Sequence, residues 1–131
     1  EVLKSSLKDK YLQTNPKSFY HEILKTLIPK GNARLVMVKH KKEFIGGAIF
    51  LLFKDTIYYW NVGLSREHMK FSPNFLLVWE MILWSKMKGY KKFDLVCIDR
   101  QKLPGIARFK LAWGGDVVKY HLIKNYSPEI R

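Results

Sequence analysis

The stretch KLPGIARFKLAWGG, residues 102–115, contains the residue with the clearest potential for chemistry, Lys110. A Pro-Gly turn opens the stretch and a double glycine closes it, which predicts a short helix between them. Four residues at the spacing i, i+3, i+4 and i+7 share one face of that helix: Ile106, Phe109, Lys110 and Trp113. Lys110 is the only charge on this face. It either stabilises negative charge in a reaction or extends along the apolar surface with its ammonium group in water.

Basic side chains gather around Lys110. Arg108 lies on the same predicted helix, and Arg100 and Lys102 come just before it. Such a cluster either contacts the phosphate groups of a substrate or forms a solvated helix edge. Phe109, the immediate neighbour of Lys110, is a further candidate for substrate contact.

The composition predicts one folded domain. The chain has 131 residues, of which 47% are hydrophobic and 15% aromatic, enough for a real core. Its single cysteine, Cys97, excludes an internal disulfide. The longest apolar run, residues 44–53, is far shorter than the roughly 20 residues that span a bilayer, so it predicts a strand. Neither the four histidines nor Cys97 show the spacing of metal ligands, and we predict no metal site.

The net charge is strongly positive. Lysine and arginine total 24 against 11 acids, which gives a formal charge of +13 spread along the whole chain. Such a field attracts RNA, anionic lipid surfaces or acidic substrates. A lysine-rich solvated surface without a polyanionic partner is the alternative interpretation.

Periodicity and turn residues predict a mixed α/β fold with helices on both faces of the sheet. The order is helix, antiparallel three-strand meander, helix, strand, helix, strand. Short links at 40–42 and 54–55 make the meander antiparallel, and the helical crossover makes the next strand parallel to its neighbour. The expected strands are 33–39, 43–53, 56–62, 92–97 and 117–123, and the long helix is 72–88.

The turn GLSREHMKFSPN, residues 63–74, precedes the long helix and carries polar candidates for ligand binding. Ser65 and Asn74 flank this turn, and a helix start offers backbone N–H groups to an anion. Tyr59, on the strand before it, either lines a groove or belongs to the core. Two lone carboxylates, Glu80 and Asp94, could act as bases only if burial raises their pKa.

Five segments in the same order resemble the FemAB-like family of the GNAT acyltransferase superfamily. They are IPKGNARLVMV, FIGGAIFLL, DTIYYWNVGLS, SPNFLLVWEMILWSKMKGYKKFDLV and GIARFKLAWGGDVVKY. The resemblance spans about residues 16 to 120 and implies a GNAT-like mixed sheet. It also implies an aminoacyltransferase that transfers an acyl group from aminoacyl-tRNA to an amine, such as one on a peptidoglycan precursor for the cell wall. Lys110 matches the lysine that follows Phe in the closing motif of the family, which implies that it stabilises the tetrahedral oxyanion.

The glycine-rich loop of many GNAT enzymes is missing from the turn at 63–74, which weakens the case for acetyl-CoA. Two alternatives to the tRNA-dependent enzyme stay open: an acyl-CoA-dependent N-acetyltransferase, and a non-catalytic module of the same fold that binds RNA or a protein partner. No bound cofactor is expected. Because FemAB-like proteins carry two such domains, we expect residues 1–15 to lead in from an upstream GNAT-like domain and residues 16–131 to form one acyltransferase domain. The expected location is the cytoplasm, with contact to the inner face of the membrane.

Overall fold

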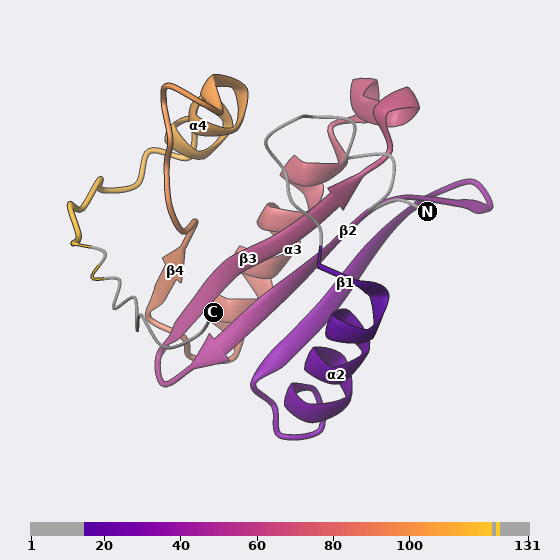
Figure 1. Cartoon of the computed structure of the whole chain (residues 1–131), viewed down its shortest axis with the longest axis horizontal. Helices are drawn as coiled ribbons and strands as arrows, with labels where there is room; N and C mark the ends of the chain where they lie inside the picture. The colour runs from indigo at the N-terminus through magenta and orange to yellow at the C-terminus, as the bar shows by residue number, and fades with distance from the viewer. Residues whose placement is uncertain (1–14, 122, 124–131) are drawn as a thin grey trace, which may run out of the picture. The chain divides into compact units, whose positions relative to one another are not determined.

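A four-stranded sheet in the order β1-β2-β3-β4 organises the first part of the chain (Figure 1). The computed structural model describes residues 15–121 and 123. They belong to two units, Glu1–Cys97 and Ile98–Arg131, and each unit is described by itself. The predicted lead-in, residues 1–15, lies outside the described residues except for Asn15.

Three strands form the predicted antiparallel meander: β1 (Ala33–His40), β2 (Glu43–Phe53) and β3 (Thr56–Leu64). Two-residue turns join them, and Lys41 and Lys54 adopt positive φ there. A short fourth strand, β4 (Lys92–Asp94), then pairs in parallel with the start of β3. The expected meander and parallel crossover are therefore confirmed.

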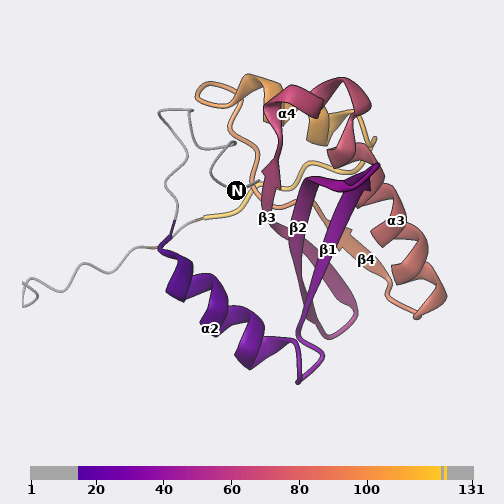
Figure 2. The same ribbon diagram turned by 90° about the vertical axis from the view of Figure 1, so that its right-hand side faces the viewer.

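Two helices cover opposite faces of this sheet, as Figure 2 shows. The first, α2 (Lys17–Leu27), begins after Pro16, and the second, α3 (Pro73–Met87), connects β3 to β4. The central strand β2 is buried from Ile45 to Phe50, including residues that point to either face. The predicted helices on both faces are confirmed.

The helix α3 is less buried than its sequence suggests. Its apolar residues run almost all the way round, which predicts burial on several sides, yet only the face toward the sheet is buried. Because the sheet covers one side of the helix, the opposite side leaves large apolar residues 40–77% exposed: Phe75, Leu76, Trp79, Leu83 and Met87. Ser72 occupies the N-cap position of α3, in the left-handed conformation and without a capping hydrogen bond from its side chain.

Gly46 and Gly47 lie where other groups come close to β2. A Cβ atom on Gly46 would lie 3.1 Å from Cβ of Pro73, the first residue of α3, and one on Gly47 would clash with the sulfur of Met37. The register with β1 shifts beside this pair, at Val38, which marks a bulge. Glycine therefore lets α3 begin close to the sheet.

Among its described residues, 98–121 and 123, the second unit contains one helix, α4 (Pro104–Leu111). The carboxylate of Asp99 accepts hydrogen bonds from the backbone N–H groups of Gln101 and Lys102 and so fixes the turn before it. The strand expected at 117–123 is a wrong prediction for residues 117–121, which adopt no regular structure, while residue 122 lies outside the described residues. β-branched residues favour a strand but do not make one without a hydrogen-bonded neighbour.

Candidate functional site

The outer edge of β3 is the most distinctive feature of the sheet. Along its other edge β3 pairs with β2 as far as Leu64, but β4 accompanies it only from Thr56 to Tyr58. Within the described sheet, residues 60–63 therefore have no strand on the outer side. Alternate peptide groups of such an edge point outward and can pair with another extended chain.

A bulge marks the point where β4 leaves. Ile49 pairs with Asn61 and Phe50 with Tyr59, so Trp60 is the extra residue on β3. The indole of Trp60 is half-buried, and its ring centroid lies 6.1 Å from that of Phe19 on α2. Pairing with β2 continues past this bulge as far as Leu64, whereas pairing with β4 ends just before it, at Tyr58.

Tyr59, a predicted ligand contact, lies in the core. Its side chain is only 5% exposed, and its ring centroid is 5.5 Å from that of Phe50. Burial raises the pKa of the Tyr59 phenol well above its ordinary value, so the group stays neutral. Its ring therefore has little surface with which to stack on a ligand, a correction to the groove-lining hypothesis.

The turn between β3 and α3 contains a short 3-10 helix, η1 (Arg66–Phe71). Ser65, a predicted binding residue, precedes it, and its hydroxyl lies 2.9 Å from Nδ1 of His68. The other ring nitrogen of His68 lies 3.6 Å from a carboxylate oxygen of Glu43. Asn74, the other predicted residue of this turn, is half-buried in the first turn of α3.

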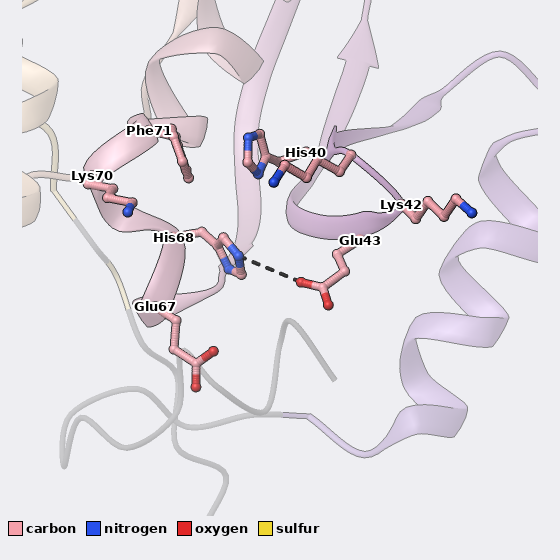
Figure 3. Close-up of a pocket in the computed structure, with 8 residues that line it drawn as sticks. His40, Lys42, Glu43, Glu67, His68, Lys70 and Phe71 are labelled. Atoms are coloured by element: carbon pink, nitrogen blue, oxygen red, sulfur yellow. Dashed lines mark ion pairs between the residues drawn. The ribbon is translucent and has the colours of Figure 1, made fainter.

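A hollow of about 680 Å³ opens between η1 and the β1–β2 turn (Figure 3). Its polar and charged lining is His40, Lys41, Lys42, Glu43, Glu67, His68 and Lys70. The ring of His40 lies on that of Phe71, with centroids 4.2 Å apart, and His68 and Glu43 point toward one another. The hollow thus combines several cations with an aromatic surface.

Sequence reasoning missed this hollow. Neither His40 nor His68 follows a recognisable motif, and 27 residues separate them. Only the antiparallel register, which places the β1–β2 turn beside the end of β3, brings them within 6.3 Å. A usable signal was the lysine pair at 41–42, which marks a tight turn next to a predicted binding loop.

Lys110 lies on α4 in the second unit, where it is half-buried. Its neighbour Phe109 packs edge-to-face against Trp113, with ring centroids 6.2 Å apart. The predicted phosphate-binding residues of this unit are Arg100, Lys102 and Arg108, and all three side chains are exposed. Their chemical roles remain predictions.

The remaining candidates for a catalytic or metal-binding role have less structural support. Glu80 and Asp94 are both exposed, so neither carboxylate has the buried position that the hypothesis of a catalytic base requires. Cys97 is exposed and lies beyond β4, which ends at Asp94 rather than at the expected residue 97. Within residues 15–121 and 123, no group of three or more metal-ligating side chains comes together, and no helix is long and apolar enough to cross a bilayer.

Solved structures of N-acetyltransferases share this arrangement of strands and helices. A ribosomal-protein-alanine N-acetyltransferase from Brucella melitensis biovar Abortus 2308 superposes with a TM-score of 0.67 at 15% identity, over 95% of this chain and 88% of that chain. AAC(6')-Iy, solved with the bisubstrate analogue CoA-S-monomethyl-acetylneamine, gives a TM-score of 0.71 at 8% identity, over 95% of this chain and 89% of that chain. The aminoglycoside 6'-N-acetyltransferase AAC(6')-IG from Acinetobacter haemolyticus gives 0.62 at 11% identity, over 98% and 93%. At such identities the likeness shows the fold.

The sequence itself identifies the family. A comparison with curated proteins finds no match. The model of the acetyltransferase (GNAT) domain matches residues 3–111, which is most of the chain. The predicted superfamily is thereby confirmed, whereas its FemAB-like branch remains a prediction. The chain belongs to the acetyltransferase (GNAT) domain family.

Proposed function

We propose that this protein is an N-acyltransferase that takes its acyl group from acyl-CoA and transfers it to an amine. The observation that carries the proposal is the outer edge of β3, which β4 leaves after Tyr58. The pantetheine arm of CoA is extended and contains two amide groups. Such an arm can pair with an open strand edge in the way that a bound peptide adds a strand.

The surroundings of this edge fit the phosphate groups of the same donor. Lys41, Lys42 and Lys70 line the hollow at the end of β3, and the first turn of α3 begins beside it. Cations and the N–H groups of a helix start both favour phosphate. The missing glycine-rich loop is the one feature that does not fit, because η1 occupies its place.

The reaction is a nucleophilic substitution at the thioester carbonyl. The amine nitrogen forms a bond to the carbonyl carbon, the carbon–sulfur bond breaks, and the proton lost by nitrogen is available to the leaving thiolate. Lys110 is our proposed stabiliser of the negative charge that develops on the carbonyl oxygen. We propose that Ser65, Asn74, Arg100, Lys102, Arg108 and Phe109 bind donor or acceptor.

A second candidate function is transfer from aminoacyl-tRNA, as the FemAB-like resemblance implies. The formal charge of +13 favours it, since tRNA is a polyanion. The acceptor in that case is an amine on a cell-wall precursor. The division into a lead-in at 1–15 and one domain at 16–131, the upstream domain, the cytoplasmic location and contact with the membrane face are parts of this proposal.

Thermal denaturation of the whole chain separates the two donors. A ligand at a hundred times its Kd adds about 2.7 kcal/mol to the free energy of unfolding. For a chain of 131 residues this raises the Tm by about 10 °C. We expect acetyl-CoA to give this shift, and the pantetheine fragment to give part of it through the β3 edge alone.

Uncharged tRNA and a poly-anion such as heparin serve as the matched comparison. A shift with tRNA but none with acetyl-CoA or pantetheine would reject the acyl-CoA proposal in favour of the second candidate. Equal shifts with heparin and tRNA would show only general attraction to negative charge. No shift with any of them would reject both donors.

A further inference from the structure

A second hollow, of about 740 Å³, opens at the far end of the sheet. It lies where β1 begins, where β2 ends and where α3 ends, whereas the hollow beside η1 lies at the other end of β1 and β2. The volume falls within the range of about 300–1,000 Å³ that is typical of small-molecule sites. Its position separates it from the proposed acyl donor.

The charged residues that line this hollow are all cations: Arg34, Lys54 and Lys88. All three side chains are exposed, and none forms an ion pair with an acid among the described residues. No carboxylate lines the hollow. Three uncompensated positive charges around one concave surface create a positive potential that attracts an anion.

The floor of the hollow is aromatic and apolar. The guanidinium carbon of Arg34 lies 4.3 Å from the ring centroid of Trp84, and the ring of Tyr90 stacks on that of Trp84 at 5.8 Å. Stacking occupies the flat face of a guanidinium and leaves its N–H donors, which lie in the plane, able to reach an anion. Leu52 and Leu35 add apolar surface beside the rings.

We propose that this hollow binds a nucleotide, through its phosphate on Arg34 and Lys88 and its base against the apolar and aromatic floor. Cations alone would suit inorganic phosphate, but the aromatic floor favours a ligand with a planar ring as well as a phosphate. The nucleotide is either free or part of a single-stranded RNA. The proposal is independent of the acyl donor, because the hollow is at the opposite end of the sheet.

Binding of AMP and of a ten-nucleotide single-stranded RNA to the whole chain tests the proposal, with inorganic phosphate as a third probe. The test variant is Arg34→Gln with Lys88→Gln. The matched control is Lys17→Gln with Lys25→Gln on α2, which removes the same charge from exposed residues outside both hollows. We expect the test variant to lose about tenfold in affinity for the nucleotide probe and the control less than about twofold.

A further variant, Trp84→Leu, separates stacking from charge. This substitution should lower the affinity for AMP more than the affinity for inorganic phosphate. Unchanged Tm values for the two charge variants would confirm that they fold. Binding of AMP supports a free nucleotide, and binding of the RNA alone supports an RNA segment. Equal losses in the test and control variants would overturn the proposal, since binding would then follow net charge. It is likewise overturned if neither AMP nor the RNA binds at low salt, or if phosphatidylglycerol vesicles bind in their place.

Discussion

Adding a methyl group at Gly46 should destabilise the protein far more than adding one at Gly47. The two residues are neighbours on β2 and differ in what their new Cβ atoms meet. On Gly46 the Cβ would lie 3.1 Å from Cβ of Pro73 and 3.2 Å from a methyl group of Leu64. On Gly47 it would meet the end of the Met37 side chain.

The difference in cost follows from how easily each neighbour moves. Pro73 is fully buried, has a rigid ring and begins α3, so relieving the contact requires a shift of the helix. Met37 is unbranched and 41% exposed, and it can rotate into solvent. Overpacking of a core typically costs about 1–3 kcal/mol. Replacing glycine also lowers the conformational entropy of the unfolded chain, which adds about 0.4–1 kcal/mol to the free energy of unfolding where the new residue fits without strain.

Thermal denaturation followed by circular dichroism measures both variants. One kcal/mol corresponds to about 4 °C in a chain of 131 residues. Gly46→Ala should therefore lower the Tm by about 4–12 °C, and Gly47→Ala should leave it within about 3 °C of the parent. An equal or larger loss for Gly47→Ala would refute the reasoning, because the methionine would then be the more rigid neighbour.

Three further predictions concern the core and the proposed chemistry. Leu77→Ala, at a fully buried position of α3, should cost about 2–5 kcal/mol in urea unfolding, and Leu76→Ala on the exposed side less than about 1 kcal/mol. Lys110→Met should reduce acyl transfer by about 100-fold or more with an unchanged Tm, and full activity would remove Lys110 from the mechanism. Because burial raises the pKa of Tyr59, the folded state retains its proton above pH 10 when the unfolded state loses it, so stability falls there as pH rises. Tyr59→Phe should show a smaller fall than the parent in urea titrations between about pH 9 and 11.

Local signals in the sequence predicted the sheet well. The lysine-rich turns at 40–42 and 54–55 lie between apolar runs, and such turns leave little choice but antiparallel neighbours. Glycine inside an apolar strand needs a packing reason, and for Gly46 and Gly47 it is the close approach of Pro73 and Met37. In the turns the physical cause lies within a few residues of the effect, whereas the residue that approaches Gly46 is Pro73, 27 positions further along the chain.

Features that depend on distant residues were not predictable in the same way. The hollow beside η1 forms only once the strand register brings His40 to Phe71. The sequence predicts that the outer side of α3 is buried, because Trp79 and Leu83 are apolar. The sheet, however, covers only the opposite side of the helix. The hydrophobicity of a side chain shows that burial would be favourable for it. Whether the side chain is buried depends on how many layers of structure pack around the helix.

The end of β4 connects the local sequence to the proposed site. The backbone N–H of Val96 donates a hydrogen bond to the carboxylate of Asp94 at 2.6 Å, and Val96 has a φ of 63°. A β-branched residue rarely adopts positive φ, and this conformation is costly unless its surroundings impose it. β4 ends at this turn, and among the described strands none continues along the outer edge of β3 from residue 60. The exposed carboxylate that sequence reasoning weighed as a base is thus part of the turn at the end of β4, beyond which the edge proposed to bind the donor begins.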